Sequence, residues 1–72
     1  MDEKFYRISQ ELAPYLNGEK ASGKIPDSLI NRYIQIVEGI EGKRVHQFSV
    51  EDNKKYPGLE VILNVKYRRM GL

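Results

Sequence analysis

The sequence predicts an α+β fold, in which two N-terminal helices pack on one face of a C-terminal antiparallel β-hairpin (helix, helix, strand, strand). In the first half of the chain, apolar residues recur at spacings of three and four, as on one face of a helix. Near the C-terminus they alternate instead, as in a strand with one buried face: Leu59, Val61, Leu63, Val65 and Tyr67. A length of 72 residues predicts a single domain over residues 1–72.

The first helix is expected to begin at Asp2, because an aspartate side chain can cap the free N–H groups of a helix start. Its apolar face is formed by Phe5, Ile8, Leu12 and either Tyr15 or Leu16. Pro14 has no backbone N–H and its ring clashes with the preceding turn. The regular helix should therefore stop near Ala13 or kink there, with an irregular last turn at Tyr15 and Leu16.

Residues 17–25 contain two glycines and few apolar side chains, which predicts a flexible linker. Within it, the segment from Gly18 to Lys24 matches the first seven positions of a phosphate-binding P-loop. A P-loop follows a buried strand and has Ser or Thr after its lysine, whereas this segment follows a helix and continues with Ile25. We therefore expect no nucleotide site.

The second helix is expected over residues 28–41, with Asp27 or Ser28 as its cap and Gly42 as its end. Its apolar face is formed by Leu29, Ile30, Tyr33, Ile36, Val37 and Ile40. Several β-branched residues and Gly39 also allow a strand as an alternative, although the apolar residues of this segment fit an alternating pattern less well than a helical one. Ile34 falls outside the apolar face and should enlarge the surface available to a partner.

Residues 45–50 alternate as well, which predicts a first strand with His46, Phe48 and Val50 on one face. Pro57 and Gly58 fit the central positions of a type II turn that leads into the last strand. That strand should bury Val61 and Leu63 together with Phe48, and it should turn Ile62 outward.

Composition narrows the function. The chain has no cysteine, which excludes disulfides and thiolate metal clusters and fits the reducing cytoplasm, where we expect the protein. No apolar run approaches the ~20 residues of a membrane span, so no membrane association is predicted. His46 is the only histidine, and alternation would point Ser49 to the opposite strand face. We therefore expect no catalytic, cofactor or metal site, and no enzyme.

The outer face of the last strand is the predicted binding surface, because it combines basic and amide side chains with an exposed isoleucine. The predicted partner-binding residues are Ile62, Asn64, Lys66, Arg68, Arg69 and Tyr56. Tyrosine and arginine commonly anchor protein interfaces, so we expect a small non-enzymatic accessory protein, an inhibitor or adaptor, that binds a surface of a larger protein.

Charge supports one alternative. Residues 43–72 carry seven Lys and Arg against three Asp and Glu, and the whole chain carries a net +2. The alternative is a small nucleic-acid-binding protein that uses the basic C-terminal hairpin, although +2 is a faint charge for that purpose. The unpaired edge of a two-stranded sheet also predicts a homodimer.

Overall fold

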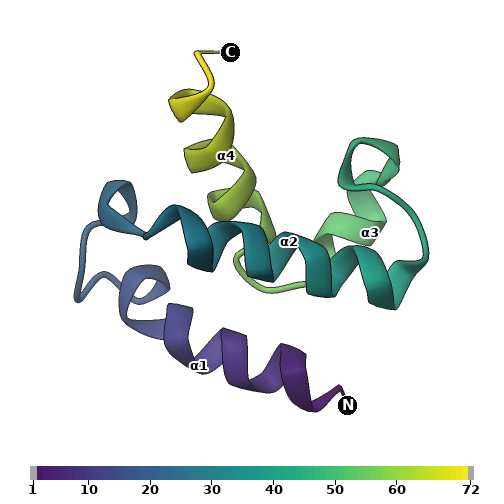
Figure 1. Cartoon of the computed structure of the whole chain (residues 1–72), viewed down its shortest axis with the longest axis horizontal. Helices are drawn as coiled ribbons and strands as arrows, with labels where there is room; N and C mark the ends of the chain where they lie inside the picture. Colours follow the sequence, from purple (N-terminus) through teal and green to yellow (C-terminus); the bar gives the residue numbers. More distant parts are fainter. Residues whose placement is uncertain (1, 72) are drawn as a thin grey trace.

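In the computed structural model, which describes residues 2–71, all regular structure is helical (Figure 1). The elements are α1 (Glu3–Leu16), η1 (Ser22–Lys24), α2 (Asp27–Glu41), η2 (Val45–Gln47), α3 (Val50–Lys54) and α4 (Leu59–Arg69), where η marks a short 3₁₀-helix. The two predicted N-terminal helices are present. The predicted α+β fold is wrong, because residues 2–71 contain no strand and hence no β-hairpin.

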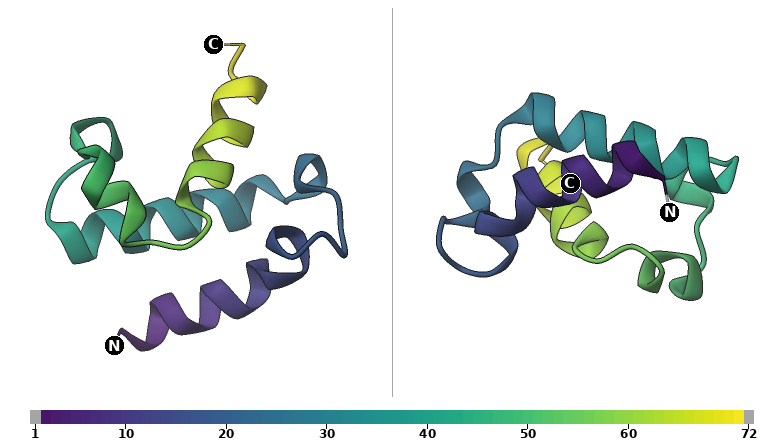
Figure 2. Two further views of the ribbon diagram at one scale, coloured as in Figure 1. Left: turned by 180° about the vertical axis from the view of Figure 1, so that it is seen from behind. Right: turned by 90° about the horizontal axis from the view of Figure 1, so that it is seen from below.

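The longest helix, α2, forms the middle of the molecule. α1 runs alongside it, α4 stands steeply to it on another side, and η2 and α3 follow its C-terminal end (Figure 1). In the view from below, α1 is drawn between α2 and the connection from α3 to α4 (Figure 2). There the ring centroids of Phe5 and Tyr56 are 5.5 Å apart, and Leu16 lies against Gly58.

The buried face of α2 is wider than predicted, because α1 and α4 contact this helix from different sides. Ile34, which we expected outside the apolar face, is only 5% exposed, whereas Ile40, which we expected on it, is 43% exposed. Tyr33 is fully buried, and its hydroxyl donates a hydrogen bond of 2.7 Å to the carbonyl oxygen of Pro57. Burial raises the pKa of Tyr33 above its ordinary value.

The C-terminal segment predicted as the last strand is the helix α4. Its buried residues recur at every third position: Leu59, Ile62 and Val65. Val61 and Tyr67, which we expected to be buried, are 39% and 37% exposed, and Leu63 is only half-buried. The helical period accounts for Ile62, which interrupted the polar face of the predicted strand and lies in the buried face of the helix.

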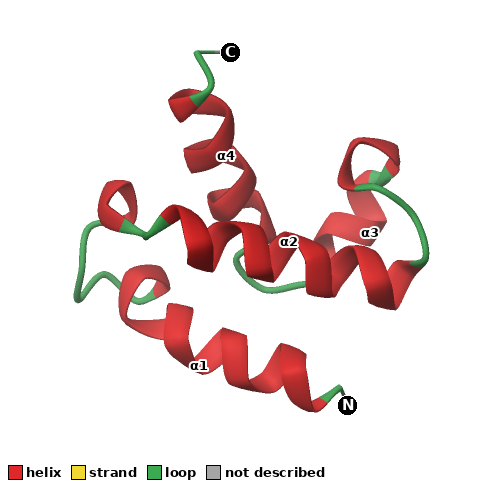
Figure 3. Ribbon diagram, in the orientation of Figure 1, coloured by secondary structure: helices red, strands yellow, loops and turns green. Residues whose placement is uncertain are grey.

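The other predicted strand, residues 45–50, consists of η2 and the start of α3 (Figure 3). Ser49 and Asp52 form a capping box: the Asp52 N–H donates to Ser49 Oγ at 3.1 Å, and the Ser49 N–H donates to Asp52 Oδ2 at 3.0 Å. Phe48, which we expected in the core, is half-buried, and Val50 is 66% exposed. The predicted turn at Gly58 is present, with a φ of 84°, but it leads into a helix.

Of the four ends of α1 and α2, two agree with the sequence prediction. Asp2 caps α1 as predicted, and Gly42 ends α2 in the left-handed conformation with a φ of 74°. α1 does not stop at Ala13 but continues through Pro14 to Leu16, which packs beside Gly58. At the start of α2, no described side chain caps the helix; Asp27 instead pairs with Arg69.

Replacing Ile62 and Val61 separately tests the helical phase of α4. We expect Ile62→Ala to lower the free energy of unfolding by about 2–5 kcal/mol, because it leaves a cavity in the core. Val61→Ala, one position away and 39% exposed, should cost less than about 1 kcal/mol. Urea denaturation of both variants measures the difference, and the opposite ranking would contradict the helix.

Candidate functional site

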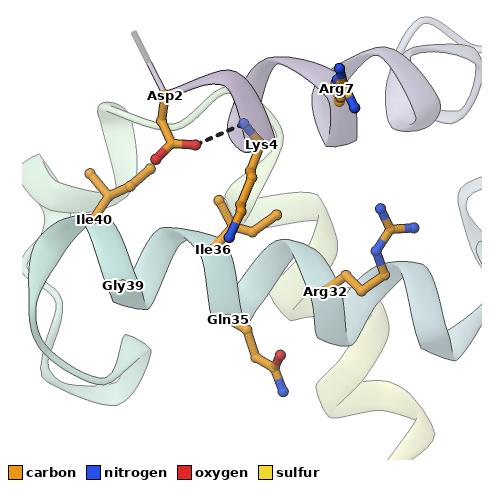
Figure 4. Close-up of a pocket in the computed structure, with 8 residues that line it drawn as sticks. All are labelled: Asp2, Lys4, Arg7, Arg32, Gln35, Ile36, Gly39 and Ile40. Carbon is orange, nitrogen blue, oxygen red and sulfur yellow. Dashed lines mark hydrogen bonds between the residues drawn. The ribbon is translucent and has the colours of Figure 1, made fainter.

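A groove of about 630 Å³ lies between α1 and the C-terminal half of α2 (Figure 4). α1 and its cap contribute Asp2, Lys4 and Arg7, and α2 contributes Arg32, Gln35, Ile36, Gly39 and Ile40. The N-cap residue Asp2 is held in place because its carboxylate accepts hydrogen bonds from the N–H groups of Lys4 and Phe5. The groove thus combines three cationic side chains with two isoleucines.

The apolar part of the groove is accessible to solvent. Ile36 is half-buried and Ile40 is 43% exposed, while Gly39 beside them has no side chain. A Cβ atom added to Gly39 would meet no atom of the described chain within 4 Å, and Gly39 does not have a positive φ. Glycine inside a helix costs about 0.5–1 kcal/mol relative to alanine. Neither the packing nor the backbone of the described chain therefore requires this glycine.

The cations around the groove are held loosely. Arg7 pairs with Glu3 at 2.9 Å and Arg32 with Glu11 at 3.2 Å, and all four side chains are at least half exposed. Exposed pairs of this kind contribute only about 0–1 kcal/mol, so either arginine can exchange its partner for another carboxylate. The Lys4 side chain hangs from α1 toward Ile36, and the Arg32 guanidinium points toward α1 (Figure 4).

A second hollow, of about 450 Å³, adjoins the groove. Gln35 and Gly39 line both, and the second hollow continues along α2 to Lys43 and Arg44. The exposed side of α2 therefore offers one continuous shallow surface, and Gly39 lies in the middle of it.

A polar cluster beyond this surface fastens α3 to the end of α2. Asp52 is only 8% exposed and accepts contacts from Lys43 Nζ at 2.7 Å and Lys55 Nζ at 3.4 Å. The hydrogen bond from Lys43 and the one from the Ser49 N–H hold the pKa of Asp52 well below its usual range. These contacts link the elements on either side of η2, which gives the cluster a structural role.

Tyr56 closes the same cluster and is one of the predicted binding residues. It is 7% exposed, and its hydroxyl donates a hydrogen bond of 2.5 Å to Glu41. Burial and then this hydrogen bond raise the pKa of Tyr56 to about 12. Tyr56 is therefore part of the core, as is Ile62, which is fully buried.

The other four predicted binding residues lie on two sides of α4, because alternate residues share a face in a strand but not in a helix. Lys66 and Arg69 turn toward α2: Lys66 Nζ lies 3.3 Å from Asn31 Oδ1, and Arg69 also donates to the carbonyl oxygen of Gly23 at 2.8 Å. Asn64 and Arg68 lie together on the exposed side. The structure does not bring the six residues together, and a role for Asn64 and Arg68 stays a prediction.

The remaining chemical candidates do not assemble into a site. His46 lies in η2 and is exposed rather than packed. No group of three or more His, Asp and Glu side chains that could hold a metal occurs among the described residues. The segment that matches a P-loop includes η1 and leads to Ile25, which is 1% exposed and belongs to the core. None of the helices in the described part of the chain has the length and apolar character to span a bilayer.

Comparisons with protein-family models, with characterised proteins and with solved structures give no match to this chain.

Sequence reasoning missed the groove because it placed Ile36 and Ile40 in the core with the rest of their helix face. One feature could have revealed it: Gly39 sits between these isoleucines, inside a segment whose pattern otherwise predicts a helix. Such a glycine weakens a helix and leaves an open position on its surface. The cations Lys4, Arg7 and Arg32 carry no such indication, because charged residues on exposed helix faces are ordinary.

The Asp52 cluster predicts a loss of stability in acid. Because the pKa of Asp52 is lowered in the folded protein, its contribution is complete above the unfolded value of about 4 and is lost as pH falls below that value. Asp52→Asn should be less stable at neutral pH, and its stability should fall less steeply between about pH 5 and pH 2. Urea melts across this range measure the effect, with Glu51→Gln, the exposed neighbour in α3, as the control. Equal acid slopes for wild type and Asp52→Asn would contradict this role.

Proposed function

We propose that this protein is a small non-enzymatic accessory protein that binds a segment of a larger protein in the groove between α1 and α2. The observation that carries the proposal is Gly39, which weakens α2 although the described chain leaves room for a side chain there. A bound backbone that approaches α2 closely would require the absence of that side chain. The groove would then act as an adaptor or inhibitor surface.

The lining supports a partner of particular chemistry. Ile36 and Ile40 offer an apolar contact, and three cations, Lys4, Arg7 and Arg32, line the groove with it. The one carboxylate in the lining, that of Asp2, already accepts hydrogen bonds from the N–H groups at the start of α1. An apolar centre with a polar rim is the usual anatomy of a protein interface. The partner segment would therefore carry one large apolar side chain flanked by carboxylates. The lack of cysteine fits a partner in the reducing cytoplasm.

Nucleic-acid binding has less support from the arrangement of charge. The surface predicted for it, a basic hairpin, is absent from residues 2–71. Six cationic side chains of the described chain are engaged in ion pairs: Arg7, Arg32, Lys43, Arg44, Lys55 and Arg69. A nucleic-acid surface needs its Lys and Arg directed together at phosphates. We retain this alternative only as an outcome of the test below.

Substituting Gly39 separates stability from binding. Gly39→Ala should raise the free energy of unfolding by about 0.5–1 kcal/mol, because alanine favours the helix and its Cβ meets no neighbour. Gly39→Gln should keep the fold but fill the groove. A random peptide display library, selected on the wild type and counter-selected on Gly39→Gln, supplies the binding probe.

We expect selected peptides with an apolar residue between carboxylates, and a loss of at least about tenfold in affinity for Gly39→Gln, equal to ~1.4 kcal/mol. Gln35→Ala, which removes a side chain from the same groove without filling it, is the matched control. Failure to enrich any peptide, or peptides that bind Gly39→Gln equally well, would overturn the proposal. Micromolar binding of a single-stranded oligonucleotide, lost in Arg68→Gln but kept in Gly39→Gln, would favour the nucleic-acid alternative.

A further inference from the structure

A second surface lies along α1, on the side away from the groove. Six positions of this helix and its C-cap form a stripe without charge: Tyr6, Ser9, Gln10, Ala13, Leu16 and Asn17. Charged residues make up 31% of the chain, so an exposed helix side that carries none over three turns is unusual for a solvated surface.

The stripe contains both a projection and a hollow. Tyr6 is 53% exposed, and its ring is held along the helix because Gln10 Nε2 donates a hydrogen bond of 3.0 Å to its hydroxyl. Beside its ring, an apolar hollow of about 430 Å³ is lined by the small side chains of Ser9 and Ala13 and by Leu16 and Pro57.

From this geometry we infer that a second copy of the chain packs on the stripe, with the two α1 helices antiparallel. A two-fold interface brings the same patch of both chains together, so each projection must meet a hollow of the same patch. Tyr6 and Ala13 are seven residues apart, which is about two helical turns and places them on one side of the helix. An antiparallel pair centred between Ser9 and Gln10 seats each Tyr6 on Ala13 of the other copy. A parallel pair would put Tyr6 on Tyr6 and leave the hollow empty.

Charge is compatible with the antiparallel arrangement. Along the edge of the stripe, the charged residues Glu3 and Arg7 lie in its first half, and the amides Gln10 and Asn17 lie in its second half. Turning one helix around sets Glu3 level with Leu16 and Arg7 level with Leu12 of the other copy, so neither charge meets a like charge. The uncharged centre offers nothing to the acidic partner proposed for the groove, whereas an identical uncharged stripe matches it. One helix from each chain forms a small interface, so the dimer should be weak.

The sheet edge from which a homodimer was predicted does not exist in the described chain, so this dimer has a different basis. It is also independent of the proposed groove, because Lys4 and Ala13 lie on opposite sides of α1. Gly39→Gln should leave the dimer unchanged. Loss of partner binding in the groove and loss of dimerisation through α1 can therefore be measured separately.

Light scattering coupled to size-exclusion chromatography tests the inference between ~10 μM and ~1 mM, a range suited to a small interface. The mass should rise from 8.4 kDa toward twice that value. Ala13→Glu should keep the mass monomeric at all concentrations while its circular dichroism spectrum stays helical. Tyr6→Ala should also remain monomeric, whereas Tyr67→Ala, the control that removes an exposed tyrosine from α4, should still dimerise. A monomer at every concentration, or a dimer that survives Ala13→Glu, would overturn the inference.

Single cysteines provide a second readout, because the chain has none of its own. Ser9→Cys lies next to the proposed two-fold axis, so mild oxidation should link two copies through this position. Glu11→Cys is the matched control, since it lies on another side of the same helix and is also accessible. Linkage of Ser9→Cys at least about tenfold faster than Glu11→Cys is expected, as for a pre-formed contact rather than a random collision. Equal rates would contradict the antiparallel pair.

Discussion

Burial of one broad face of α2 is the constraint on which the rest of the structure depends. A chain of this length can bury only about 60% of its unfolded surface, so it has room for one core and little redundancy. Tyr33 lies at the centre of that core. Its ring centroid is 5.8 Å from that of Phe5 in α1, and its hydroxyl reaches the Pro57 carbonyl before α4. One side chain thus connects three parts of the chain.

The same constraint explains where the surfaces of interest lie. Because α1 and α4 contact α2 from different sides, its C-terminal half retains an uncovered side at Gly39 and Ile40. α1 packs through one face only, so its opposite face carries the uncharged stripe with Tyr6. Both candidate surfaces are therefore helix faces that the single core does not use.

The sequence predicted α1 and α2 well, because caps at Asp2 and Gly42 agree with a clear helical period. It failed in the C-terminal third because Leu59 to Val65 is a short apolar run, and such runs fit both periods. Alternation accounts for this segment only if Ile62 is an exception on the polar face. The capping box of Ser49 and Asp52 was available in the sequence and indicates a helix start. As a helix, the segment buries Leu59, Ile62 and Val65 in the core around α2, and Lys66 and Arg69 reach polar groups of α2 and η1. No local pattern in the sequence reveals these contacts.

The candidate site was also hard to predict from the sequence, because the exposure of its residues depends on tertiary packing. Ile40 could be placed on a helix from its spacing, but its exposure depends on where α1 begins beside it. The six predicted binding residues depended on the strand, and their grouping disappeared with it. Gly39 is the exception, because a glycine within a helical period is visible without any tertiary information.

The central claim is that residues 59–69 form a helix seated on α2. Backbone NMR assignment tests it most directly, because Cα chemical shifts report helix or strand at each residue independently of side-chain packing. The account predicts helical shifts without interruption over Leu59–Arg69, together with nuclear Overhauser effects from the Ile62 methyl groups to side chains of α2. Strand-type shifts across Leu59 to Tyr67, with cross-strand contacts to residues 45–50, would contradict it.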